Sequence, residues 1–136
     1  MTRILLITMT LAILVGCQQP DMSPSPGLGD PYPPPINNPD ISVLDRGLQQ
    51  WLAFQPAVRI RDSRTPLTVQ VPVRNMADRA YLIEYRYLFY DASGLEQTPV
   101  MGWKFAKLEP KQVVNLSANA MDTSAVTYRL EVKWSR

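Results

Sequence analysis

The chain has 136 residues with 14 basic and 12 acidic side chains, and its net charge of +2 is too small to indicate a nucleic-acid partner. It contains no histidine and one cysteine, Cys17, which excludes an internal disulfide and removes the commonest general base and the soft metal ligands. The acidic residues fall mostly in turn-like segments, where hydrogen bonds to the backbone account for them. We therefore expect no enzyme, no metal site and no cofactor.

The N-terminus has the plan of a secretory signal. Arg3 precedes an apolar run from Ile4 to Val15 that only Thr8 and Thr10 interrupt. A short positive flank followed by about 7–15 apolar residues is typical of signal peptides, whereas a membrane-spanning helix needs about 20. Residues 1–16 are therefore predicted to be a signal peptide that is removed on export, and export argues separately against a nucleic-acid partner.

The apolar run ends in a sequence that resembles a lipobox. Leu14, Val15 and Gly16 precede Cys17, so the expected cut falls before the cysteine and its sulfur accepts a diacylglycerol. Two or three acyl chains, at about 0.8 kcal/mol per buried methylene, hold a protein durably on a membrane. Gln18 is not the aspartate that retains enterobacterial lipoproteins in the inner membrane. We expect an envelope protein anchored by lipid, facing the periplasm, on the outer membrane.

Residues 17–40 are predicted to form the lipidated cysteine and a disordered linker. Eight of the 13 prolines lie between Pro20 and Pro39. Proline fixes φ and removes a hydrogen-bond donor, so this segment suits an extended tether that reaches up to roughly 70 Å. The run Pro33–Pro35 is interpreted as part of a stiff spacer, with a ligand for a proline-binding groove as the alternative.

From residue 41 to residue 136 the composition is that of a folded domain. Residues 42–54 suit one helical turn or the lead-in to a strand, and apolar residues then alternate with polar ones, which indicates half-buried strands. Turn-rich segments separate six or seven such strands, and this spacing is typical of an all-β sandwich. Pro72 interrupts one alternating stretch, so we expect a bulge or an interrupted neighbour there. The expected strands lie near 58–60, 67–73, 81–89, 103–105, 111–118 and 128–134.

Several short stretches of the domain resemble one family. They are the run from Tyr85 to Gly94, then Trp103, the triplet from Leu108 to Pro110, and the triplet from Tyr128 to Leu130. Together they resemble the YcfL-like lipoproteins, a DUF1425-type family of unknown function, over residues 55–134, although Phe89 stands where the family has tryptophan. The resemblance implies an immunoglobulin-like antiparallel β-sandwich in the envelope and a link to cell-wall machinery, and it supplies no catalytic residue.

The strand that starts near residue 81 has two distinct faces. Tyr81, Tyr85 and Tyr87 share one face, which we interpret as core, with a ligand pocket as the alternative. Leu88 and Tyr90 fall on the opposite face and are candidates for an exposed apolar contact. Both Trp103 and Trp134 are expected to pack in the core. Truncation of a buried tryptophan costs about 3–5 kcal/mol, so Trp103→Ala is expected to unfold much of the population or to lower its melting point sharply.

Four arginines are predicted to point outward: Arg59, Arg61, Arg74 and Arg86. If their strands are neighbours, they form a basic patch that suits anionic lipid or cell-wall carboxylates, unless Glu84 and Glu131 neutralise it.

Two functions remain after this reading of the sequence. The first is a non-catalytic interaction module that docks on another envelope protein. The second is a carrier of a small apolar ligand in a cavity between the sheets, lined by Tyr81, Tyr85 and Trp103. A fully packed core favours the interaction module, whereas an open cavity of several hundred Å3 favours the carrier.

Overall fold

The structure is a computed structural model that describes residues 38–135. The predicted signal peptide and most of the predicted linker lie outside these residues. Within them the chain forms short strands, and both structures expected for residues 42–54 occur, since a helical turn lies between two short strands. The elements in chain order are β1 (Ile41–Val43), α1 (Arg46–Gln49), β2 (Leu52–Phe54), β3 (Val58–Asp62), β4 (Thr65–Asn75), β5 (Tyr81–Tyr90), β6 (Lys104–Leu108), β7 (Val113–Asn119) and β8 (Thr127–Trp134).

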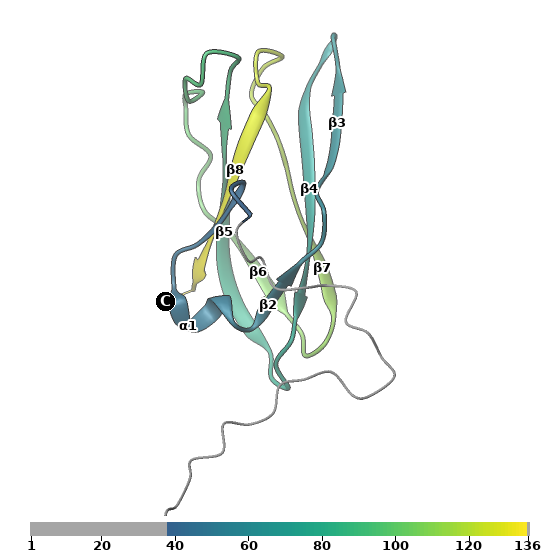
Figure 1. Ribbon diagram of the computed structural model, residues 1–136, viewed down its shortest axis with the longest axis vertical. Coiled ribbons are helices and arrows are strands. Elements are labelled where there is room, and N and C mark those ends of the chain that lie inside the picture. Colours follow the sequence, from purple (N-terminus) through teal and green to yellow (C-terminus); the bar gives the residue numbers. More distant parts are fainter. Residues whose placement is uncertain (1–37, 136) are drawn as a thin grey trace, which may run out of the picture.

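The strands form two sheets that face each other, as Figure 1 shows. The first sheet has the order β1-β8-β5-β6. In the second sheet β4 is central: β7 pairs along one side of it, and β2 and β3 pair in succession along the other. The loops β3–β4, β5–β6 and β7–β8 lie at the upper end of Figure 1, and α1 lies at the lower end.

The connections confirm a β-sandwich and place the strands as immunoglobulin-type folds do. The chain crosses between the sheets from β1 through α1 to β2, from β4 to β5, from β6 to β7 and from β7 to β8. The sandwich is antiparallel except at one edge, where β1 runs parallel to β8 with Ile41 opposite Leu130. The predicted antiparallel sandwich is confirmed, with this three-residue parallel pairing as an addition at the edge of the first sheet.

Pro72 lies where the neighbour of β4 is interrupted. On one side of β4, the residues from Val73 to Asn75 pair with β2 and those from Thr65 to Gln70 pair with β3. Pro72 lies between these two paired stretches. Its carbonyl accepts a hydrogen bond from the Gln55 N–H at 2.9 Å. Because N–H and C=O of one strand residue point the same way, the missing proline donor faces this gap. The expected interrupted neighbour is confirmed.

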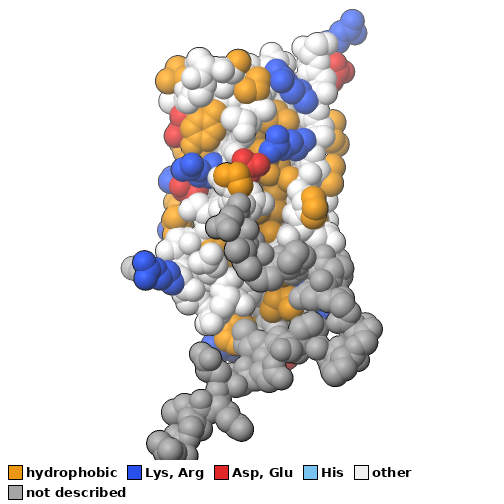
Figure 2. Space-filling model, viewed as in Figure 1, with side chains coloured by type: hydrophobic (Ala, Val, Ile, Leu, Met, Phe, Trp, Pro, Cys, Tyr) orange, Lys and Arg blue, Asp and Glu red, His pale blue; other side chains and the backbone are white. Residues whose placement is uncertain are grey.

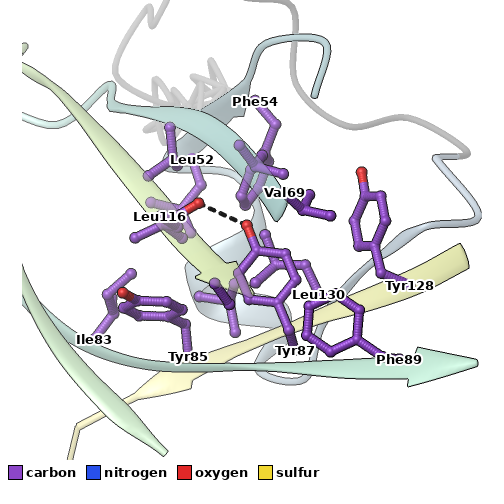
Figure 3. Packing of buried hydrophobic residues seen from close by; sticks show 14 of the residues in the cluster. Leu52, Phe54, Val69, Ile83, Tyr85, Tyr87, Phe89, Leu116, Tyr128 and Leu130 are labelled. Carbon is purple, nitrogen blue, oxygen red and sulfur yellow. Dashed lines mark hydrogen bonds between the residues drawn. The ribbon is translucent and has the colours of Figure 1, made fainter. Parts of the chain in front are cut away.

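The space between the sheets is filled by a core in which Tyr87 is central (Figure 3). Tyr87 is fully buried, and its hydroxyl donates a hydrogen bond to the Leu116 carbonyl at 2.6 Å. Its ring stacks on Phe89 with centroids 5.9 Å apart and lies 5.6 Å from that of Tyr128. Burial raises the pKa of Tyr87 far above its ordinary value. The tyrosine row of β5 is therefore core, as predicted.

Candidate functional site

The predicted lipidation site lies outside the described residues: Leu14, Val15, Gly16 and Cys17. Among residues 38–135, no helix is long and apolar enough to cross a membrane. No group of three or more His, Cys, Asp or Glu side chains in the same range is placed to hold a metal ion.

The four arginines predicted to form one patch lie on two different sheets. Arg59 and Arg61 are on β3 and Arg74 is at the far end of β4, whereas Arg86 is on β5 in the other sheet. Figure 2 shows basic side chains scattered among hydrophobic ones on the face in view. The single basic patch is not formed, because Arg86 belongs to the other sheet and Arg74 lies where β4 pairs with β2 and β7, beyond its pairing with β3.

Arg59 points to the opposite side from the one predicted. It is the partner of Val69 in the β3–β4 pair, and Val69 is fully buried, so Arg59 lies on the inner side of an edge strand. Its guanidinium lies 4.8 Å from the Tyr128 ring centroid and 2.8 Å from Asp40 Oδ2. Val58 and Ile60 are exposed instead. An inward charge on an edge strand hinders pairing with other strands, which gives the inverted pattern a structural role.

Arg86 lies on the outer face of the first sheet, within a ladder of opposite charges. Its Nε lies 2.7 Å from Glu131 Oε2, and Lys133 Nζ lies 2.9 Å from Glu84 Oε2. These residues oppose one another across the β5–β8 pair. The sequence left open that Glu84 and Glu131 neutralise the basic side chains. For Arg86 this alternative is confirmed, because Glu131 pairs with it directly.

Trp103 lies over this charge ladder and not in the core, so its predicted location is wrong. The Arg86 guanidinium carbon lies 4.6 Å from the Trp103 ring centroid, and Lys133 Nζ lies 4.3 Å from it. Phe105, two residues further on, is opposite Glu84 and 67% exposed. The two rings share one face, as period two requires, but it is the outer face. Trp134, by contrast, packs against the core and meets the Tyr81 ring at 4.7 Å.

Trp103→Ala is now expected to have a small effect on stability. Cation–π contacts at exposed sites contribute about 0.5–1 kcal/mol each, so the loss should be about 1–2 kcal/mol in place of the 3–5 kcal/mol of a buried tryptophan. Thermal melting followed by circular dichroism measures this difference, with Phe105→Ala as the matched control on the same face. A Trp103→Ala chain that is unfolded at room temperature would contradict the surface location.

Leu88 and Tyr90 do not form the exposed apolar pair that was predicted. Leu88 is on the outer face of β5, yet only 8% of it is exposed, because the β5–β6 loop folds over it. Tyr90 pairs with Glu96 of that loop through an isolated bridge, and its carbonyl accepts the Val126 N–H at 2.8 Å. Sequence alternation identified the face correctly but not the loop that covers it.

The loop that covers Leu88 also forms one wall of an apolar pocket with a volume of about 130 Å3. Tyr85 and Trp103, expected to line a ligand cavity, line neither this pocket nor a more open one of about 250 Å3 beside Trp51 and Tyr81. Both pockets lie at the ends of the sandwich. The residues of the apolar pocket are Tyr87, Leu88, Phe89, Gln97, Pro99, Val100, Met101, Asn119 and Met121.

Gln97 ties the two loops beside this pocket together. Its Nε2 donates to Asp122 Oδ1 at 2.6 Å and to Ser124 Oγ at 2.7 Å. The Ser124 hydroxyl and backbone N–H hold the pKa of Asp122 below its ordinary value, with Gln97 adding to the effect. A carboxylate only accepts hydrogen bonds, so the amide nitrogen must face Asp122. The amide oxygen is buried and has no partner among the described residues.

Sequence reasoning missed the pocket and the Gln97 link. The signal available was a set of apolar residues in turn-rich segments, Val100, Met101 and Met121, where no strand needed them. Their convergence depends on two loops far apart in the chain.

The fold and these surface features define a small two-sheet β-sandwich domain with a filled core. Residues 41–134 match the model of a family described as "Protein of unknown function (DUF1425)", and the chain belongs to this family. The predicted family is thereby confirmed. The narrower resemblance to its YcfL-like members stays a prediction.

Two solved structures share the fold. A crystal structure of Campylobacter jejuni cj0090 is similar with a TM-score of 0.57 and 22% identity, covering 71% of this chain and 98% of that one. A crystal structure of a DUF1425 family member from Shewanella sp. pv-4 is similar with a TM-score of 0.54 and 20% identity, covering 62% of this chain and 79% of that one. No curated protein matches the chain.

Proposed function

We propose that this protein is a lipid-anchored envelope lipoprotein whose sandwich domain acts as a non-catalytic interaction module. In this proposal Cys17 carries the lipid, residues 18–40 are the tether, and the domain binds another protein of the envelope or of the cell-wall machinery. The signal-like run before Cys17 and the proline-rich segment after it support the anchoring.

The observation that carries the proposal is the filled interior. The large side chains of β4, β5, β7 and β8 occupy the space between the sheets, and the Tyr87 hydroxyl is already used by the Leu116 carbonyl. Sites for drug-sized ligands have volumes of about 300–1,000 Å3. The apolar pocket, at about 130 Å3, has room for a group the size of one side chain. The domain is therefore better suited to contact through its outer surface than to carry a ligand inside.

Crosslinking in intact cells tests this proposal. The full chain, tagged at its C-terminus, is expected to give a discrete crosslinked species with another envelope protein. That species should disappear with a variant whose core is broken, Tyr87→Ala, and remain with the surface variant Thr68→Ala. Crosslinking that persists at the same level in the Tyr87→Ala chain would show that the folded domain does not bind the partner.

A further inference from the structure

The loop between β4 and β5, residues 76–80, is held in shape by the side chain of Asn75, which is fully buried. Its Nδ2 donates to the Arg79 carbonyl at 2.7 Å and to the Leu108 carbonyl at 3.0 Å. Its Oδ1 accepts the Ala77 N–H at 2.9 Å. A buried amide whose donors and acceptor are all engaged makes the backbone around it rigid. The loop therefore presents its side chains in a fixed geometry.

Beside this loop, aromatic rings form one wall of the more open pocket of about 250 Å3. The Trp51 carbonyl accepts the Met76 N–H at 2.8 Å, which ties the loop to the segment after α1. The Trp51 and Tyr81 ring centroids are 6.5 Å apart, and the Tyr81 ring meets that of Trp134 at 4.7 Å. The pocket combines this wall with charged groups of the loop, since its lining residues are Trp51, Ala77, Asp78, Arg79 and Tyr81.

The charges around this pocket are two cations and one anion. Lys111 Nζ lies 3.3 Å from Asp78 Oδ1 and also donates to the Met76 carbonyl, so the Asp78 carboxylate has a counter-ion. Arg79 is exposed, and its Nε donates to the Tyr81 hydroxyl at 3.1 Å. Within residues 38–135 the Nη atoms of Arg79 form no hydrogen bond. The pocket therefore favours a ligand that carries a negative charge.

These features together suit a sugar ring. The faces of aromatic rings are electronegative, so the polarised C–H groups on one face of a sugar pack on them while its hydroxyls meet polar neighbours. A carboxylate pairs with the planar donors of a guanidinium through two parallel hydrogen bonds. A cationic ligand is disfavoured, because the Arg79 guanidinium already lies 5.3 Å from the Tyr81 ring centroid. The volume is below the about 300–1,000 Å3 of drug-sized sites, so it suits one ring.

We propose that this pocket binds one sugar ring of a glycan, and that the ring carries a carboxylate. The ring packs on Trp51, and its carboxylate pairs with the Nη donors of Arg79. A ring hydroxyl donates to the Asp78 carboxylate, which only accepts hydrogen bonds. Asn75 and Lys111 hold the loop for this contact and do not touch the ligand. The site goes beyond the proposed contact with another protein and does not depend on it.

Three small probes test the chemistry of the ligand with the full chain in detergent micelles. N-acetylmuramic acid has the ring and a carboxylate, N-acetylglucosamine has the same ring without the carboxylate, and lactate has a carboxylate without the ring. The sequence has three tryptophans, so indole N–H signals report binding by NMR, and Trp51→Phe identifies the signal of Trp51.

N-acetylmuramic acid is expected to shift the Trp51 signal and to leave that of Trp103 unchanged. It should do so at a concentration about tenfold lower than either other probe requires, because only this probe makes both the ring contact and the charge-assisted hydrogen bonds. Equal binding of lactate would reduce the site to a simple anion contact, and equal binding of N-acetylglucosamine would remove the role of the carboxylate. Either result would overturn the proposal.

Arg79→Gln tests the assignment of the residue. The backbone carbonyl that holds Asn75 is retained, so the circular dichroism spectrum should match that of the parent. Binding of N-acetylmuramic acid is expected to weaken about tenfold or more, as the loss of charge-assisted hydrogen bonds implies. Arg64→Gln is the matched control, because this exposed arginine lies in the β3–β4 turn at the opposite end of the sandwich (Figure 1). Parent-like binding by folded Arg79→Gln, or an equal loss in Arg64→Gln, would overturn the sugar site.

Discussion

Replacing Tyr87 with alanine is expected to remove a large part of the free energy of unfolding of the domain. The side chain is fully buried, its ring contacts Phe89 and Tyr128, and its hydroxyl is bonded to Leu116 on the opposite sheet. Truncation of a large buried aromatic costs about 3–5 kcal/mol, against a total stability of about 5–15 kcal/mol for a domain. Denaturant unfolding followed by circular dichroism or tryptophan fluorescence measures the loss.

Tyr87→Phe separates the hydroxyl from the ring. This substitution keeps the ring packing and removes one hydrogen bond. We therefore expect the free energy of unfolding to fall by about 0.5–1.5 kcal/mol, plus the cost of the small void left where the hydroxyl was. The Leu116 carbonyl still has its partner in β4 within the ladder. Equal losses in Tyr87→Ala and Tyr87→Phe would show that the hydrogen bond, not the ring, holds the two sheets together.

Replacing Cys17 with alanine is expected to abolish lipid attachment altogether. The sulfur is the acceptor in the proposed modification, and no other cysteine exists in the sequence. Without acyl chains the chain loses the burial of methylenes, about 0.8 kcal/mol each, that would hold it on a membrane. Growth with a labelled fatty acid should show label on the parent chain and none on Cys17→Ala, with the precursor left uncut at this position.

Gln18→Asp is the matched variant for sorting. It leaves the sulfur in place, so incorporation of the labelled fatty acid should match that of the parent. In an enterobacterial host, the aspartate after the cysteine is expected to keep the protein in the inner membrane, while the parent reaches the outer membrane. Label on the Cys17→Ala chain would overturn the lipoprotein assignment, and identical fractionation of the Gln18→Asp and parent chains would overturn the outer-membrane location.

The strands were predictable because the sequence alternates strongly. The apolar positions of β4, β5 and β8 repeat at period two, and each of these strands has one buried face. Pro72 was informative for a related reason. Proline has no N–H to donate, so in a central strand it costs no ladder hydrogen bond only where the neighbouring strand is interrupted. Such constraints are local, and they do not depend on knowing which strands are neighbours.

The errors at Arg59 and Trp103 share a cause. Alternation identifies residues that share a face but not which face meets the core, and edge strands are only weakly constrained by burial. In β3 every residue is exposed, so hydrophobicity gave the wrong direction for Val58 and Arg59. Trp103 lies before a short edge strand, where cations of β5 and β8 cover its ring, and those cations are far away in the sequence.

The surface features depend on contacts that no local pattern contains. Gln97 and Asp122 meet across 25 positions of the chain, and the apolar pocket exists because their loops lie side by side. Among residues 38–135, the position of β7 at the edge of its sheet becomes apparent only when the strand order is known.

Asp40, where the folded domain begins, connects the two sheets and so affects how the domain bears a mechanical load. Its carbonyl accepts the Leu130 N–H at 2.8 Å in the first sheet, and its carboxylate lies 2.8 Å from the Arg59 guanidinium on the second. Any tension that reaches the domain from its N-terminal side arrives at this residue and is divided between the two sheets. A pull therefore loads both halves of the sandwich together, and peeling of the three-residue β1 alone requires the ionic contact to break first.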